Sequence, residues 1–253
     1  MFSPRDLDLV SGAPTERRRY IDLVLALTDK RYLNALQHYR ANLLRRNAAL
    51  RDAARRGGRS ADERVAVWEP ALAEHGTILI ERRARWVEES AAEFTRLSEM
   101  IGEQGRSEMR YVSPFAESEA RHDVLLAAFE EKRGLDIKRG LTHVGPHRDD
   151  LELTIDGREL RLFGSAGQQR TAAIALRMLE AATIREHAGA EPILLLDDPF
   201  AELDTRRSTR ILELLRQGGL GQAILAVPRE SDIPVELMRL ARLSIRTGVI
   251  DAQ

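Results

Sequence analysis

The 253-residue chain contains no cysteine, and this absence excludes disulfide bonds, thiolate catalysis and zinc sites built from thiolates. Aromatic residues make up only 5% of the chain, so base-stacking platforms for single-stranded nucleic acids are not indicated. No stretch approaches the roughly 20 apolar residues of a membrane-spanning helix. The first ten residues include the charged side chains of Arg5, Asp6 and Asp8 and have no apolar signal-peptide core, so we expect a cytosolic protein.

Lysine is also scarce, and this scarcity bears on nucleotide binding. The three lysines are Lys30, Lys132 and Lys138, and none follows the glycines of a G-x-x-x-x-G-K-[ST] loop. That loop, the Walker A motif, wraps the phosphates in P-loop nucleotidases, so this sequence contains no Walker A motif. The hydrophobic content of 43% is sufficient for one large domain or two smaller ones.

The net charge of −1 conceals a difference between the two ends of the chain. Residues 1–60 contain 13 basic and 6 acidic side chains, so this segment carries about +7 and the remainder about −8. A basic segment can attract phosphate backbones. Solvent-exposed faces of surface helices have the same composition. Composition alone therefore does not decide between a segment that binds phosphate backbones and one that is simply solvated.

An aliphatic run that ends in carboxylates lies between Glu191 and Thr205. Residues 193–196 lead directly into Asp197 and Asp198, which favours a strand buried on both faces with its acids at the carboxyl edge of a parallel sheet. One or two carboxylates together with substrate phosphates are the usual ligands of Mg²⁺. Alternatively, the acids only end a strand in solvent and Asp204 caps the next helix.

A glycine-containing loop precedes this strand by about thirty residues. Gly164 to Thr171 reads GSAGQQRT and opens a segment with helical apolar periodicity. Free backbone N–H groups and the positive end of a helix dipole make such a loop a phosphate-binding device. A simple helix cap at Ser165 is the alternative, and the acidic strand that follows strengthens the nucleotide interpretation.

These stretches resemble ABC-type ATPases of the SMC and RecF group. Ser165–Gln169 is similar to their signature motif, Ile193–Asp198 to their Walker B strand and Ala201–Asp204 to their D-loop. Three further stretches resemble the RecF family in particular, and the resemblance covers essentially the whole chain from Phe2: FSPRDL (Phe2–Leu7), ERRRYID (Glu16–Asp22) and VGPHRDDL (Val144–Leu151).

The resemblance implies an α/β fold, the C-terminal half of an ABC-type P-loop ATPase lobe plus an inserted antiparallel helical arm. It divides the chain into a remnant of the first ATPase lobe (1–14), the arm domain (15–133) and the C-terminal ATPase half (134–253). Family members carry the Walker A loop in an N-terminal part before the region that resembles this chain. We therefore expect an upstream start or a half-site chain with exposed apolar sheet edges and poor solubility.

Hydrophobic periodicity agrees with a helical arm. From Thr15 to Leu50 the pattern is helical, with a heptad-like apolar stripe at 32, 36, 39, 43 and 50 that Arg46 interrupts. Glycines 57 and 58 break the pattern, and Pro70 begins or interrupts a second long helix. In that helix, apolar residues recur every seven positions from Ile80 to Ile101. Such stripes are explained by packing alone, and we prefer that interpretation to a functional one.

The pattern changes after a third helix, which is expected over 118–131. From Gly134 onward the composition predicts strands and turns, with a strand at Asp150–Ile155. Asp156-Gly157 predicts a type I′ hairpin, and residues 158–163 are expected to form the returning strand. Further on, the sequence predicts a helix over 205–217 and strands over 222–227 and 241–246.

The histidines of the VGPHRDDL stretch suggest metal binding, which we disfavour. His143 and His147 have no carboxylate at a convincing ligand spacing. In the family this segment joins the arm to the nucleotide-binding lobe. The resemblance therefore places His147, Arg148 and Asp149 near the nucleotide or the lobe interface, and no chemical role is assigned to them.

The resemblance also implies roles for the motif residues. Asp197 would hold Mg²⁺, and Asp198 would position or deprotonate the attacking water. Asp204 of the D-loop would lie across the interface between two subunits. The γ-phosphate of ATP held by the opposite subunit would be bound by the signature residues Ser165, Gly167, Gln168 and Gln169.

An ATP-dependent homodimer of this kind would grip double-stranded DNA and single/double-strand junctions. In the family, this DNA binding supports recombinational repair and replication restart, with RecO and RecR helping to load the recombinase. Without a Walker A motif, we expect weak or no ATP hydrolysis by this chain alone. The alternative is a non-catalytic module that binds DNA or a RecR-like partner. Val227-Pro228-Arg229, in place of the family's switch residue, favours that alternative, and the intact Asp197-Asp198 pair argues against it.

Overall fold

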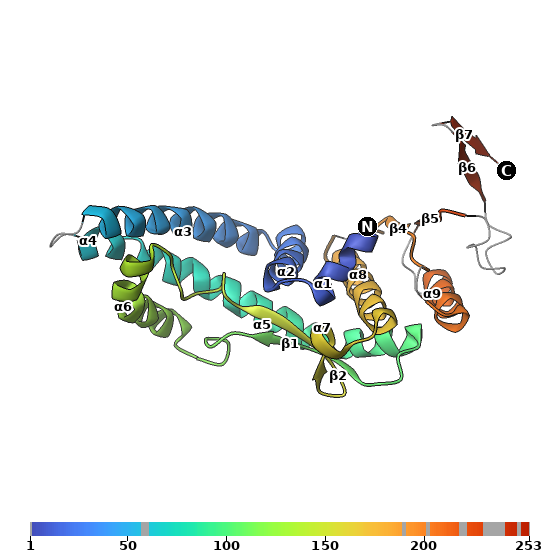
Figure 1. Cartoon of the computed structure of the whole chain (residues 1–253), viewed down its shortest axis with the longest axis horizontal. Coiled ribbons are helices and arrows are strands. Elements are labelled where there is room, and N and C mark those ends of the chain that lie inside the picture. Colours follow the sequence, from blue (N-terminus) through green and yellow to red (C-terminus); the bar gives the residue numbers. More distant parts are fainter. Residues whose placement is uncertain are drawn as a thin grey trace.

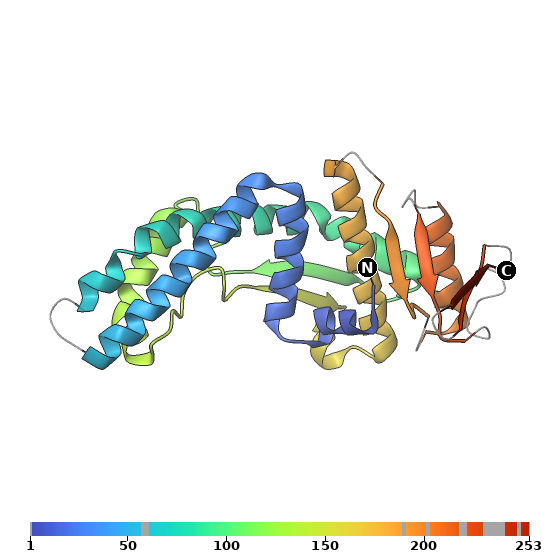
Figure 2. The ribbon, with the colours of Figure 1, turned by 90° about the horizontal axis from the view of Figure 1, so that it is seen from above.

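The computed structural model describes residues 2–56, 61–188, 191–200, 203–217, 222–229, 241–246 and 249–252. The molecule is elongated, with long helices toward one end and short strands toward the other (Figures 1 and 2). None of the helices in the described ranges is long and apolar enough to cross a membrane. The helices are η1 (Pro4–Leu7), α1 (Asp8–Ser11), α2 (Pro14–Thr28), α3 (Lys30–Arg56), α4 (Ala61–Ala66), α5 (Glu69–Ile101), α6 (Arg121–Arg139), α7 (Leu160–Phe163), α8 (Ala166–Ala188) and α9 (Thr205–Gln217). The strands are β1 (Ser107–Val112), β2 (Asp150–Ile155), β3 (Arg158–Glu159), β4 (Leu194–Asp197), β5 (Ala223–Ala226), β6 (Leu243–Arg246) and β7 (Val249–Ala252).

The helical arm is built on α3 and α5, which lie side by side (Figures 1 and 2). The helix predicted over 15–50 is divided in two, because Asp29 has extended backbone angles between α2 and α3. Its carboxylate accepts hydrogen bonds from the backbone N–H groups of Arg31 and Tyr32, at 2.8 and 3.1 Å, and so caps α3. Because the apolar spacing continues past Asp29, periodicity alone does not reveal the break.

Helix α5 carries the predicted apolar stripe. Pro70 lies in its first turn, as predicted, and the stripe from Ile80 to Ile101 is buried. The helix ends at Gly102, whose φ of 118° lies in the left-handed region that favours glycine. The turn predicted at residues 57 and 58 lies outside the described residues.

Arg46 fills the place where the α3 stripe lacks an apolar residue. Its side chain is 0% exposed and forms ion pairs with Glu69 of α5 at 2.9 Å and Asp136 of α6 at 2.7 Å. It also donates to the hydroxyl of Thr142 at 2.8 Å, and its guanidinium lies over the ring of Phe129. A buried charge is tolerated only when it is paired and hydrogen-bonded, so this cluster joins three helices at one point.

The middle of the chain differs from the sequence prediction in two ways. Helix α6 continues through Gly134 to Arg139 and ends at Gly140, with φ 67°. The buried side chain of Asp136, held by Arg46, fixes the last turns of this helix. Strand β1 was not predicted; it pairs antiparallel with β2, so a strand inside residues 15–133 joins one from residues 134–253.

The hairpin after β2 agrees with the sequence prediction in its turn but not in its second strand. Asp156 and Gly157 both have positive φ, 48° and 74°, as a type I′ turn requires. The returning strand stops at Glu159, and residues 160–163 form the helical turn α7 instead. Leu160 is buried in the core while Leu162 and Phe163 are exposed, and this burial pattern does not fit a strand lying flat on β2.

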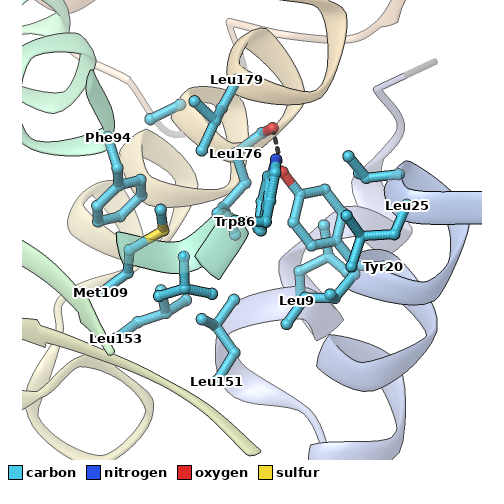
Figure 3. Close-up of a cluster of buried hydrophobic side chains, with 14 of the residues drawn as sticks. Leu9, Tyr20, Leu25, Trp86, Phe94, Met109, Leu151, Leu153, Leu176 and Leu179 are labelled. Carbon is cyan, nitrogen blue, oxygen red and sulfur yellow. Dashed lines mark hydrogen bonds between the residues drawn. The ribbon is translucent and has the colours of Figure 1, made fainter. Parts of the chain in front are cut away.

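One apolar core extends through all three predicted segments. Figure 3 shows side chains of α1, α2, α5, β1, β2 and α8 packed together, with Trp86 of α5 at the centre. Trp86 donates to the hydroxyl of Thr183 on α8 at 3.3 Å, and Tyr20 donates to the carbonyl of Leu176 at 2.6 Å. The domain boundaries at 14/15 and 133/134 stay a prediction. In the described residues, the three segments share one apolar core.

The strand predicted to be buried on both faces is buried on only one. In β4, Leu194 and Leu196 are buried, while Leu195 is exposed. The strand pairs in parallel with β5, and Phe2 continues this sheet through a bridge to Leu196. Apolar side chains are exposed on β4 and β5 and, in a separate two-stranded sheet, on β6 and β7. The predicted poor solubility stays a prediction. Strand β7, which pairs with β6, was not predicted.

We expect Arg46→Met to lower the free energy of unfolding by about 3–5 kcal/mol, because Asp136 loses its arginine in a buried site and Glu69 keeps only the pairing with Arg133 among those described. Urea denaturation measures this loss. The neighbouring Arg45 is exposed and stacks on Trp68, so Arg45→Met is the matched control and should cost about 1 kcal/mol or less. Equal losses for the two variants would contradict a structural role for the buried cluster.

Candidate functional site

The loop that resembles the signature motif is closed by a capping box. Gln168 N–H donates to the Ser165 hydroxyl at 3.3 Å, and Ser165 N–H donates to the Gln168 side-chain carbonyl at 3.0 Å. Ser165 thus has the cap role that the sequence left as the alternative, and the residue is exposed at the start of α8. A capping serine at a helix N-terminus is also placed to meet an anion.

The rest of this loop packs against α7 and is hydrogen-bonded to it. The side-chain amide of Gln169 donates to the carbonyl of Leu160 at 3.1 Å. At Gly164, an added Cβ would lie 2.6 Å from that same carbonyl, so the approach of the two backbones requires glycine. Gln169 therefore supports the loop, whereas Ser165 and the partly exposed Gly167 form its outer surface.

The two aspartates at the end of β4 differ in backbone conformation. Asp197 is exposed at the carboxyl end of the strand, and its N–H donates to the carbonyl of Phe2 at 2.9 Å. Asp198 has a φ of 49°, in the left-handed region, and its N–H donates to the carbonyl of Ala226 at 2.9 Å. A non-glycine residue in this region is strained and frequently marks a functional site.

Arg170 joins the two motifs, and sequence reasoning missed it. This buried side chain of α8 donates to the backbone carbonyls of Asp198 and Pro199, and it lies over the ring of Phe2. Through these two carbonyls it fixes the backbone of the turn after β4. Its position directly after the SAGQQ stretch was the available signal.

Asp204 is an N-cap, as in the alternative interpretation. Its carboxylate accepts from the N–H of Arg207 at 2.8 Å, and its carbonyl accepts from Ser208. Helix α9 covers the predicted residues 205–217. Ala201 and Glu202 of the D-loop lie outside the described residues. The segment Val227-Pro228-Arg229 follows β5, next to the Asp198 turn that β5 holds through Ala226.

The VGPHRDDL segment lies against the arm. His147 is held between Tyr39, at 2.7 Å from Nδ1, and the Thr142 carbonyl, at 3.1 Å from Nε2. A carbonyl can only accept, so Nε2 carries the proton and Nδ1 accepts from the tyrosine hydroxyl. Burial lowers the pKa of His147 to about 4, so the ring is neutral near pH 7. Burial also raises the pKa of Asp149, which accepts a hydrogen bond from Tyr111.

A divalent metal ion has few ligands here without a substrate. In the part of the chain that the structure describes, no three His, Asp or Glu side chains gather as a metal cluster. The exposed carboxylate of Asp197 fits the usual Mg²⁺ arrangement, in which phosphates supply the remaining charge. The placement of these side chains therefore suits a metal–nucleotide complex better than a resident metal.

Comparison with known proteins agrees with the resemblance to RecF. A scan against protein-family models finds no match. The DNA replication and repair protein RecF of Herpetosiphon aurantiacus is 36% identical over 253 residues, covering 99% of this chain and 65% of that protein. RecF of Chloroflexus aurantiacus is 38% identical over 250 residues, covering 96% and 64%. The chain belongs to the RecF family.

Solved RecF structures support the same assignment. The structure titled recombination mediator protein RecF-ATP in the RecFOR pathway superposes with a TM-score of 0.82 at 29% identity, over 100% of this chain and 66% of that one. An Smc head domain from Pyrococcus furiosus shares the fold, with a TM-score of 0.51 at 16% identity. The chain thus has the α/β fold of an ABC-type ATPase head with a helical arm. It spans about 65% of the length of the curated relatives it matches.

The pKa of His147 predicts a loss of stability in mild acid. The folded-state pKa of about 4 lies below the ordinary 6.5, so the unfolded chain binds the extra proton between these values. Stability is therefore full above pH 6.5 and falls by about 3 kcal/mol as the pH drops to 4. Urea denaturation at several pH values should show this slope, and His147→Gln should reduce it. The exposed His122 supplies the control, His122→Gln, and an unchanged slope in His147→Gln would contradict the assignment.

Proposed function

We propose that the chain supplies the signature-motif and Walker B half of an ATP-dependent DNA-binding protein in recombinational repair and replication restart. The observation that carries this proposal is the joining of the capped SAGQQ loop to the Asp197-Asp198 turn by Arg170. Both motifs keep their functional side chains on the surface while buried contacts fix their backbones. Phosphoryl transfer depends chiefly on positioning and electrostatics, which this arrangement provides.

The proposed residue roles come from the family resemblance, and the placement of the side chains supports them. Asp197, at the exposed carboxyl end of β4, holds Mg²⁺ with the phosphates of ATP, and Asp198 positions or deprotonates the attacking water. Asp204 caps α9 and faces the opposite subunit. The γ-phosphate of the nucleotide on that subunit meets the positive end of α8 through Ser165, Gly167 and Gln168, while Gln169 acts by supporting the loop through its bond to the Leu160 carbonyl. ATP then joins two copies, and the dimer holds double-stranded DNA or single/double-strand junctions with RecR and RecO as partners.

Helix α3 supports the DNA-binding part of the proposal. Between Lys30 and Arg55 its only acidic residue is Asp52, and its exposed basic side chains are Lys30, Arg31, Arg40, Arg45, Arg51 and Arg55. Arg40 pairs with Asp22, and Arg45 stacks on Trp68. Arg55 donates to the carbonyl of Arg51 on the same helix, and Lys30, Arg31 and Arg51 are also exposed. The helix has 27 residues, a length that suits successive phosphates of a duplex backbone.

The second candidate is a non-catalytic module that binds DNA or a RecR-like partner. The observation that favours it is Val227-Pro228-Arg229 beside the Asp198 turn, where the family carries a switch residue that senses the γ-phosphate. In that case the α3 surface acts alone, and duplex binding ignores ATP.

One measurement distinguishes these functions, and a second tests the DNA surface that both of them use. The first adds the Walker A-bearing N-terminal part of the Herpetosiphon aurantiacus relative to this chain and follows phosphate release from Mg-ATP. We expect turnover only in the mixture, and loss of turnover with Asp198→Asn or Ser165→Arg. Duplex binding that is unaffected by ATP and survives Asp198→Asn would favour the module. Steady hydrolysis by the soluble monomeric chain alone would overturn the half-site proposal.

The second measurement is the salt dependence of duplex DNA binding. Because each phosphate contact releases counterions, replacing Arg51 and Arg55 by alanine should reduce the slope of log K against log salt by about 1 for each arginine. Arg85→Ala is the matched control, since Arg85 lies exposed on α5 and pairs with Glu81. An equal change in all variants would exclude α3 as the DNA surface.

A further inference from the structure

Glu103 is fixed to the end of the arm helix α5. At the end of the helix, the single N–H of Gly102 is shared between the carbonyls of Ser98 and Glu99, and the N–H of Glu103 donates to the carbonyl of Ser98 at 3.0 Å. The bonds from Gly102 to Glu99 and from Glu103 to Ser98 form a Schellman motif, which leaves the Glu103 backbone little freedom. The side chain is only 4% exposed, so its carboxylate needs partners inside the protein.

Those partners come from the SAGQQ loop and from α9. The side-chain amide of Gln168, on the SAGQQ loop, donates to Oε1 at 3.4 Å. Arg207 of α9, whose backbone N–H is capped by Asp204, donates to Oε2 at 3.2 Å. Oε1 also accepts from the backbone of Gln104 and Gly105, at 3.0 and 3.3 Å. One buried carboxylate thus contacts the arm, the signature-like loop and the helix after the D-loop.

This contact also sets the orientation of the Gln168 amide. An ionised carboxylate only accepts hydrogen bonds, so the NH₂ group of Gln168 must face Glu103. The carbonyl of that amide is then left for Ser165 N–H, and the capping box closes. Without Glu103 the Ser165 N–H still directs the carbonyl, but the NH₂ group loses its carboxylate acceptor and the amide is held by one partner fewer.

We propose that Glu103 is a positioning residue that orients Gln168 for phosphate and couples this loop and α9 to the arm. The Gln168 NH₂ group has two acceptors to choose from, the Glu103 carboxylate or a phosphate oxygen. When phosphate takes it, Glu103 retains Arg207 and the contact between loop and arm is released. This exchange step rests on the proposed function, whereas the positioning does not.

The competing explanation is that Glu103 merely shapes the turn at residues 104 and 105. The chain has no cysteine, so paired spin labels can be placed freely at Glu89 on α5 and Glu213 on α9, both exposed. Double electron–electron resonance then reports the α5–α9 distance, and selective ¹⁵N-glutamine labelling reports the Gln168 NH₂ signals. Both readouts use the full chain without nucleotide.

In Glu103→Ala we expect a broader α5–α9 distance distribution and a shift of the Gln168 signals. Arg207→Met should broaden the distances only, and Glu103→Gln should restore the Gln168 signals in part. Glu108→Ala is the control, because Glu108 is 46% exposed and pairs with Arg106, which is also exposed. Unchanged readouts in Glu103→Ala, or changes in Glu108→Ala of the same size, would overturn the positioning role. Since Arg207→Met leaves the turn intact, it covers the case in which Glu103→Ala does not fold.

The exchange step is tested in the mixture that contains the Walker A-bearing part and Mg-ATP. Turnover together with a further shift of the Gln168 signals would support it. Turnover without a shift would overturn the exchange. An absence of turnover, with the nucleotide-free results as expected, would count against the proposed function and leave the positioning role standing.

Discussion

The structure depends on the burial of the apolar stripe along α5. This 33-residue helix packs against α3 and α6 in the arm, against β1, and against α8 and α9 near the nucleotide motifs. Because one rigid helix has partners along its whole length, the arm and the ATPase-like half share a single core. Burial of side chains such as Trp86 and Phe94 supplies the favourable free energy, at about 1.5–3 kcal/mol for each large apolar group.

Buried guanidinium groups fix how the elements meet along this helix. Arg83 of α5 donates to Asp22 of α2, to Tyr32 of α3 and to the carbonyl of Pro146, each at 3.0 Å or less. Arg46 does the same for α3, α5 and α6 farther along the arm. Apolar packing tolerates small shifts, whereas a buried charge with several directed partners permits one arrangement. The arm is thus positioned by polar contacts within an apolar frame.

The same design continues at the candidate site. Arg170 and Glu103 are buried and hold backbone or amide groups, while Asp197 and Ser165 remain exposed. The exposed face of β4 and β5 agrees with a sheet that represents one half of a larger ATPase lobe, as the coverage of the RecF relatives indicates. Under the proposed function, such a half would supply groups that meet a nucleotide, and this sequence contains no Walker A motif.

Local patterns in the sequence determined the apolar stripes of α3 and α5, the turn at Asp156-Gly157, the extent of α9 and the family. These features depend on residues close together in the chain, where periodicity and turn chemistry suffice. Tertiary structure alone decided that Arg46 fills the arm seam, that β1 pairs with β2, that α6 passes Gly134, and that β4 has one exposed face. It also decided the roles of Glu103 and Arg170, because a buried charge is explained by partners distant in sequence, which no local pattern contains.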